Sequence, residues 1–152
     1  MDVHAPTPST THPNAPSTSR DVMTVSMPAD QQSDDIFAAH GDLVGHYNTS
    51  QIANGMSICK SGVTTYITCG TITRKFSSAI SEECDCRTYF TRAKYWSQDG
   101  DSGAPVYHAV ERPNRDVLYY AVGIHGGRGG TFEYFTRIQD ALGLLNVQLV
   151  TS

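Results

Sequence analysis

Short runs of apolar and β-branched residues alternate with polar turns along most of the chain. From residue 34 onward they predict strands at 34–39, on both arms of a hairpin over 55–72, at 88–94, from Pro105, at 118–127 and at 131–135. Residues 137–145 have apolar side chains at helical spacing, which predicts a short amphipathic helix. The pattern indicates an all-β domain followed by a short helix.

Residues 1–33 lack this pattern and consist mainly of Thr, Ser, Pro and Ala. Pro6, Pro8, Pro13 and Pro16 interrupt any helical or strand period there, and the first aromatic residue of the chain is Phe37. Such a segment buries too little apolar area to offset the entropy of ordering it. We therefore expect a disordered tail over 1–33, with a glycosylated stalk as the alternative, and one folded domain over 34–152.

Length and charge narrow the function classes. The chain has 152 residues and a formal net charge of −4. The length suits one domain, and the absence of a basic stripe argues against nucleic acid as a partner. The apolar runs are too short to span a bilayer, and the N-terminal residues lack the apolar core of a secretory signal peptide.

Residues 98–107 form the stretch with the most distinctive chemistry. Gly100 and Gly103 permit turns that a Cβ would obstruct, and they leave the Ser102 hydroxyl between them uncrowded. Backbone N–H groups of such a loop can converge into an oxyanion hole, and Asp101 can anchor the loop through a buried ion pair. A simple solvent-exposed loop is the alternative interpretation.

The predicted hairpin over 55–72 contains two of the four cysteines. Cys59 and Cys69 lie on opposite arms, near enough for a cross-strand disulfide, and Lys60-Ser61-Gly62 is expected to form the turn. Cys84 and Cys86 lie in a polar segment whose role is left open. A Cys-x-Cys pair can bind a metal, but no second ligand pair follows at a useful spacing, so we expect no metal site.

The loop at 98–107, the hairpin at 55–72 and a strand ending at 123–127 together resemble the chymotrypsin-like serine peptidases, in particular the bacterial streptogrisin-type branch. The resemblance covers about residues 34–150. It implies a chymotrypsin-like antiparallel β-barrel, mainly the second of the two barrels of that family, with a short C-terminal helix. Tyr66 departs from the pattern, because the family usually has glycine there.

The resemblance also implies roles for individual residues. Ser102 would be the nucleophile, the N–H groups of Gly100 and Ser102 would form the oxyanion hole, and Lys60 would pair with Asp101. Asp35 resembles the aspartate of the catalytic triad, although a helix cap or a solvated turn is an equally good interpretation. The positions expected to bind substrate are Trp96, Ser97, His125, Gly126 and Gly127. No acid is expected at the floor of the specificity pocket, which favours an apolar or small side chain there.

A catalytic histidine is not identified. His40 follows a stretch similar to the one that carries this residue in the family, but only eighteen residues separate His40 from Cys59. His125 is more readily interpreted as a buried polar residue than as the base. Without an imidazole a serine hydroxyl is a poor nucleophile at neutral pH.

The sequence therefore predicts an extracellular serine endopeptidase, incomplete or inactive, that acts on peptides or proteins and needs no cofactor. A non-catalytic peptide-binding module is the alternative, and an unrelated disulfide-linked β-protein is a third interpretation. Half of a two-barrel fold would expose the surface on which the barrels meet, so we also expect low solubility.

Overall fold

A computed structural model describes residues 20–23, 25, 26, 28–37, 39, 41–81 and 86–152, with only the backbone described at 81 and 86. Within these residues the elements are a 3-10 helix η1 (Ala29–Gln31), seven strands and one α-helix. The strands and the helix are β1 (Leu43–His46), β2 (Ser57–Gly62), β3 (Tyr66–Ser81), β4 (Cys86–Lys94), β5 (Pro105–Glu111), β6 (Val117–Gly129), β7 (Phe132–Arg137) and α1 (Ile138–Leu145).

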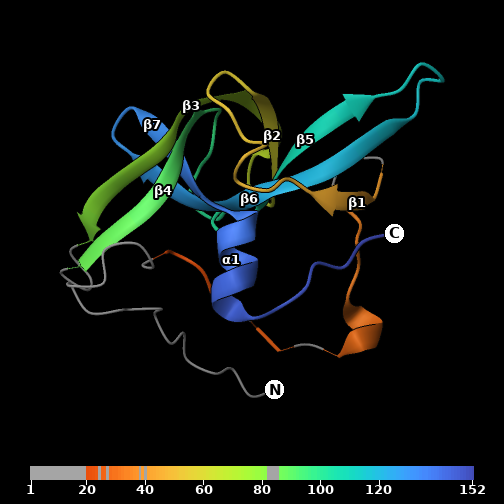
Figure 1. Cartoon of the computed structure of the whole chain (residues 1–152), viewed down its shortest axis with the longest axis horizontal. Coiled ribbons are helices and arrows are strands. Elements are labelled where there is room, and N and C mark those ends of the chain that lie inside the picture. Colours follow the sequence, from red (N-terminus) through yellow and green to blue (C-terminus); the bar gives the residue numbers. More distant parts are fainter. Residues whose placement is uncertain (1–19, 24, 27, 38, 40, 82–85) are drawn as a thin grey trace.

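The seven strands form one sheet that closes on itself. Its order is β1-β6-β5-β2-β3-β4-β7, and a further pairing of β6 with β7 joins the ends of the six-stranded part into a barrel (Figure 1). Neighbouring barrel strands are antiparallel, whereas β1 runs parallel to β6 along its outer edge. The expected all-β architecture with a short C-terminal helix is confirmed.

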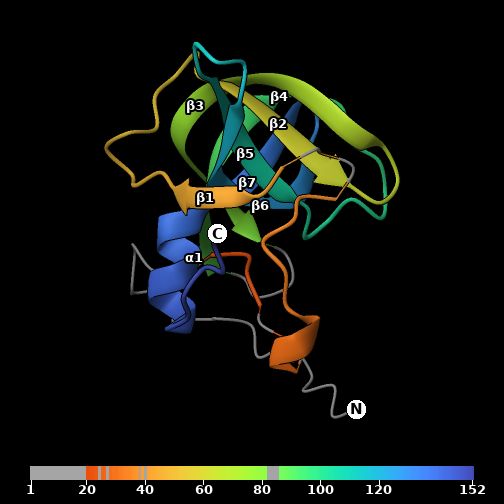
Figure 2. The ribbon, with the colours of Figure 1, turned by 90° about the vertical axis from the view of Figure 1, so that its right-hand side faces the viewer.

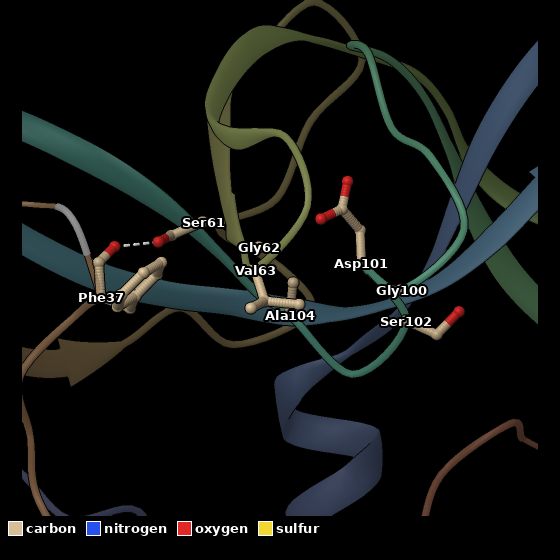
Figure 3. Close-up of a pocket in the computed structure, with 8 residues that line it drawn as sticks. All are labelled: Phe37, Ser61, Gly62, Val63, Gly100, Asp101, Ser102 and Ala104. Atoms are coloured by element: carbon tan, nitrogen blue, oxygen red, sulfur yellow. Dashed lines mark hydrogen bonds between the residues drawn. The ribbon is translucent and has the colours of Figure 1, made fainter.

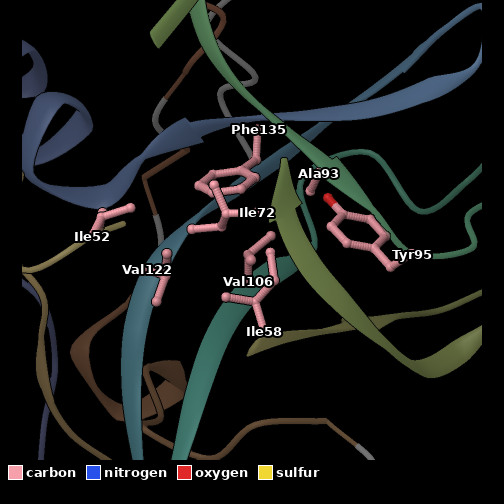
Figure 4. Packing of buried hydrophobic residues seen from close by; sticks show 8 residues of the cluster. All are labelled: Ile52, Ile58, Ile72, Ala93, Tyr95, Val106, Val122 and Phe135. Carbon is pink, nitrogen blue, oxygen red and sulfur yellow. The ribbon is translucent and has the colours of Figure 1, made fainter. Parts of the chain in front are cut away.

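Two apolar clusters hold the barrel and the helix. The first fills the barrel interior and consists of Ile52, Ile58, Ile72, Ala93, Tyr95, Val106, Val122 and Phe135 (Figure 4). The second includes Tyr107 and Ala121 from the strands and Ile138 at the start of α1, which lies at one end of the barrel (Figure 2). The helix is thus attached by the apolar face that its spacing predicts.

Two local predictions are wrong. The described residues among 34–39 form no strand: Asp35 makes an isolated bridge to Asp42, and the N–H of Ala39 donates to the carbonyl of Ile36 at 3.0 Å, as in a turn. The hairpin turn lies at residues 63–65 instead of at Lys60-Ser61-Gly62. Gly62 belongs to β2, where a Cβ would collide with the carboxylate of Asp101.

The Cys59–Cys69 disulfide is confirmed. The two residues are directly opposite each other on β2 and β3, with their Cα atoms 4.0 Å apart. The sequence interpretations for His40, Cys84 and the side chain of Cys86 lie outside the described residues. The division at residue 33 stays a prediction, although Arg20 reaches the folded part, where its Nε donates to Asp140 at 3.1 Å.

Candidate functional site

The loop between β4 and β5 presents two neighbouring side chains in opposite directions. Asp101 points into the protein and Ser102 points out to solvent (Figure 3). The backbone reverses at two glycines, Gly100 with φ of +99° and Gly103 with φ of +86°. Both values lie in the region that glycine adopts without strain, so the motif positions its serine as its residue types predict.

Asp101 anchors this loop through a buried ion pair. Its Oδ2 lies 3.1 Å from Nζ of Lys60, and both side chains are 0% exposed. The carboxylate also accepts hydrogen bonds from the backbone N–H groups of Thr64, Thr65 and Gln98 and from the Thr65 hydroxyl. Burial alone would raise the pKa of Asp101, but these hydrogen bonds outweigh it and hold the pKa well below its usual range.

The hydroxyl of Ser102 is exposed and bonded to the backbone. Its Oγ donates to the carbonyl of Gly126 on β6 at 3.1 Å. Gly103 and His125 connect the same two segments, because the Gly103 N–H donates to the His125 carbonyl at 2.8 Å. Among the described residues, no acceptor is found for the N–H groups of Gly100 and Ser102. Their predicted role in an oxyanion hole stays a prediction.

A hollow of about 250 Å³ lies beside Ser102 (Figure 3). It is lined by Phe37, Ser61, Gly62, Val63, Gly100, Asp101, Ser102 and Ala104. Phe37 stacks on Tyr66 with ring centroids 6.0 Å apart, and the carbonyl of Phe37 accepts a hydrogen bond from Ser61. The segment that precedes β1 is thereby held against the hairpin next to the candidate nucleophile.

The backbone of His125 is hydrogen-bonded to Gly103, next to Ser102, but the His125 side chain is turned into the core. It is 2% exposed, and its Nδ1 is 2.8 Å from the hydroxyl oxygen of Tyr95.

Burial is the largest effect on the pKa of His125 and lowers it. The positive charges of Lys60 and Arg128 lower this pKa further. The negative charges of Glu133 and Asp101 act in the opposite direction. The imidazole is therefore neutral at pH 7. The structure places it as a buried polar residue that makes a specific hydrogen bond.

The other described histidines form no hydrogen bond with the Ser102 hydroxyl. Nδ1 of His108 lies 2.6 Å from the carbonyl oxygen of Ser57, and His46 is exposed on β1. Within the described residues, no imidazole is hydrogen-bonded to Ser102.

Asp35 is exposed and lies within an acidic group. The Ser33 hydroxyl donates to its Oδ2 at 2.8 Å, and this bond, followed by the one with Asp42, lowers the pKa of Asp35. The same carboxyl–carboxyl contact raises the pKa of Asp42. Asp35 does not line the hollow beside Ser102, although Phe37, two residues later, does.

Asp34, Asp35 and Asp42 are also the described residues whose ligand atoms come close enough together to hold a cation, within 4.8 Å of one another. Asp35 and Asp42 are exposed, and carboxylates at a surface often gather in this way without a metal. The group is consistent with the solvated turn that the sequence offered as the alternative for Asp35.

The predicted substrate-binding residues flank the loop. Trp96 is exposed and its carbonyl accepts a hydrogen bond from the Thr68 hydroxyl at 2.6 Å. Gly126 is an extra residue in the pairing of β6 with β7, since His125 pairs with Phe135 and Gly127 with Tyr134. Such a bulge bends β6 locally and changes the direction of its groups next to Ser102.

Ser97 contacts an acid that sequence reasoning missed. Ser97 is buried, and its hydroxyl donates to Oε2 of Glu133 at 2.5 Å. Glu133 is 5% exposed and is paired with Arg128 through a distance of 3.0 Å between Nε and Oε1. No signal near Ser102 in the sequence reveals this carboxylate, because it comes from β7, 36 residues from Ser97.

The structure is similar to solved structures of bacterial proteases. The chain matches the crystal structure of Thermobifida fusca Protease A with a TM-score of 0.58 and 29% identity over 76% of the chain. It matches Cellulomonas bogoriensis chymotrypsin with a TM-score of 0.58 and 23% identity, and Nocardiopsis protease with 0.58 and 21% identity. The fold is chymotrypsin-like. The expected fold is thereby confirmed, and its structural neighbours are bacterial proteases of the chymotrypsin-like type.

The match covers 58–59% of the three bacterial proteases, so this chymotrypsin-like chain spans less than two thirds of their length. No family model and no curated protein matches its sequence. In the described part of the chain, no helix is long and apolar enough to cross a membrane.

Proposed function

We propose that this chain carries the nucleophile-bearing barrel of a streptogrisin-type serine endopeptidase, with Ser102 as nucleophile and peptides or proteins as substrates. The observation that carries the proposal is the loop around Ser102, whose hydroxyl is exposed while the adjacent Asp101 is fully buried against Lys60. A rigidly anchored loop with an exposed hydroxyl is what a nucleophile requires. The likeness to Thermobifida fusca Protease A supports the proposal.

The reaction would proceed through an acyl-enzyme. Ser102 Oγ would attack the carbonyl carbon of the peptide bond while a base takes its proton, and the N–H groups of Gly100 and Ser102 would hold the resulting oxyanion. Collapse of this intermediate would break the C–N bond and release the protonated amine, and water would then hydrolyse the ester. The unpaired N–H groups of Gly100 and Ser102 support this assignment.

We further propose that the chain is incomplete or inactive as a peptidase. The Ser102 hydroxyl donates to a backbone carbonyl, and no described histidine accepts from it. Asp35 would orient a catalytic histidine that is not among the described residues. The Cys59–Cys69 disulfide supports an extracellular location.

Labelling with a fluorophosphonate probe tests this proposal. We expect the wild-type chain to react at least about 1000-fold more slowly than a complete serine protease, because loss of a triad member costs orders of magnitude in rate. Ser102→Ala is the matched control. Rapid labelling that disappears in Ser102→Ala would contradict the inactivity and would show that a base reaches Ser102.

A non-catalytic peptide-binding module is the second candidate. It is favoured by the bulge at Gly126, which places a strand edge beside Ser102 while His125 is occupied by Tyr95. An extended peptide could add to such an edge by backbone hydrogen bonds. Peptide binding that persists in Ser102→Ala, with no cleavage by the wild-type chain, would support this candidate.

A further inference from the structure

A second hollow lies where the loop after β1 faces the middle of β3. It has a volume of about 540 Å³ and is lined by Ser50, Ile52, Ala53, Asn54, Arg74, Lys75 and Phe76. It shares no lining residue with the hollow beside Ser102. Its lining includes two cations and no carboxylate.

Irregular pairing of β3 accompanies the three consecutive residues that line this hollow, Arg74, Lys75 and Phe76. In a regular strand neighbouring side chains point to opposite faces. The pairing of β3 with β4 shifts register on both sides of Arg74, between Ile72 and Arg74 and again between Arg74 and Ser77. Such bulges redirect side chains and are over-represented near functional sites.

The positive charge at this position is not neutralised by the described residues. No described residue forms a hydrogen bond or an ion pair with the Arg74 side chain. Arg74 is paired across the sheet with Arg92, which is itself placed over the Phe132 ring at 4.1 Å. Like charges directly opposite each other destabilise a sheet, and an anionic ligand would relieve that repulsion.

Phe76 provides an exposed apolar surface beside these cations. Its side chain is 61% exposed, and the Arg137 guanidinium lies 4.4 Å from its ring centroid. Arg137 is held in turn by Asp140, which accepts from its Nε at 2.8 Å and its Nη2 at 2.6 Å. The Nζ of Lys75 lies 5.5 Å from the same ring centroid, so the exposed ring and the Lys75 ammonium are presented together.

We propose that this hollow binds an acidic segment of a partner protein. Carboxylates of that segment would pair with Arg74 and Lys75, and an apolar side chain would pack on Phe76. A guanidinium binds a carboxylate in a planar, bidentate geometry. The apolar lining favours a peptide over a free anion or a sulfated polysaccharide, neither of which carries apolar side chains. The site is independent of the chemistry at Ser102.

Fluorescence anisotropy with the full chain and a fluorescein-labelled peptide, Glu-Glu-Leu-Glu-Glu, tests the proposal at low ionic strength. We expect Arg74→Glu to weaken binding at least about tenfold, since it replaces a charge-assisted contact by repulsion. Phe76→Ser should weaken it several-fold. Arg112→Glu is the matched control, because it makes the same charge change at an exposed arginine that does not line this hollow. It should leave the affinity within about twofold.

Several results would overturn the proposal. An equal loss in Arg74→Glu and Arg112→Glu would mean that only net charge matters. Equal affinity for the Gln-Gln-Leu-Gln-Gln peptide would exclude a role for the carboxylates. Arg74-dependent binding of dextran sulfate or inorganic phosphate without binding of the peptide would reassign the site. Arg74→Gln, with its thermal unfolding compared with that of the wild type, provides the same test if Arg74→Glu does not fold.

Discussion

Lys60 and Asp101 carry the most constrained charges of the described structure. Both side chains are completely buried, and each has additional hydrogen bonds: Lys60 donates to Thr65 and to the carbonyl of Tyr66. A buried charge that loses its partner stays desolvated without compensation. The pair therefore fixes the position of the Ser102 loop relative to the β2–β3 hairpin.

Removing one partner should be strongly destabilising. We expect Lys60→Met to lower the free energy of unfolding by about 3–5 kcal/mol, because it leaves the Asp101 carboxylate buried without its cation. Urea unfolding measures this change. Lys94→Met, which removes an exposed lysine, should change stability by less than about 0.5 kcal/mol. A loss below about 1 kcal/mol in Lys60→Met would contradict the role of the pair.

Acid should weaken the fold through Asp101. Its pKa in the folded protein lies below the ordinary value of 3.8, so the unfolded chain binds more protons as the pH falls. The stabilisation from its ionised form is complete above about pH 4 and is lost progressively as the pH drops toward the folded pKa. Unfolding free energies at about pH 5 and about pH 3 should differ less in Asp101→Asn than in the wild type. Equal differences would assign the acid sensitivity to other carboxylates.

Individual residue contacts were predictable only where a local motif implied them. The Lys60–Asp101 contact follows from a resemblance spanning two motifs, and the structure brings these residues together. The contact between Ser97 and Glu133 does not follow, because it depends on how β7 packs beneath the loop. The candidate site around Ser102 stays a prediction, and the contacts that were missed are those between side chains of distant strands.

Among the strands and turns, Tyr66 marks a conflict between residue type and backbone. Its φ is +54°, a left-handed conformation that a bulky side chain rarely adopts. The residue begins β3, directly after the hairpin turn, where the resemblance led us to expect glycine. The backbone thus explains the glycine preference in physical terms, and the stacking of Tyr66 on Phe37 is a partial compensation.

Substitutions at Tyr66 should separate the backbone conformation from the side-chain contact. Tyr66→Val loses the stacking and places a β-branched residue at positive φ, so we expect it to lower the unfolding free energy by about 1–2 kcal/mol. Tyr66→Gly loses the same stacking but adopts this φ freely, and should cost less than about 0.5 kcal/mol. Thermal or urea unfolding of both variants provides the comparison. Equal costs would show that the backbone at residue 66 is unstrained.

Alternation and turn residues predicted most strands and the helix, because these signals are local. The stretch at 34–39 was mistaken for a strand since its composition is apolar, yet among its described residues only Asp35 forms a bridge, with Asp42. The hairpin turn was predicted too early in the sequence, because Gly62 is required for close approach to Asp101 and not for the turn itself. Both errors come from contacts between segments, which a local pattern does not encode.

Across the whole molecule, an exposed apolar surface adjoins the Ser102 hollow. Phe37, Val63 and Tyr66 are 55%, 70% and 59% exposed, and Phe37 stacks on Tyr66. Apolar surface gathered in one place favours association with another apolar surface. If the low solubility expected from the sequence is observed, this surface is where we expect it to arise.

Self-association should depend on this surface. We expect the wild-type chain to form concentration-dependent oligomers in sedimentation velocity, and Phe37→Ser combined with Val63→Ser to shift the population to monomer. Val117→Ser, at an exposed valine on β6, is the control and should leave the association unchanged. A monodisperse wild-type monomer at the same concentrations would contradict the prediction.

The order of strands around the barrel has a consequence for synthesis on the ribosome. The barrel closes only through β6 and β7, which pair with each other and with β5 and β4. As the chain emerges, one edge of β5 must therefore stay unpaired until Ile124 has left the exit tunnel, and one edge of β4 until Phe135 has left it. Fold closure by such non-local pairs is slow, and open strand edges are prone to aggregation. Nascent chains that pause before β6 should depend most on chaperones.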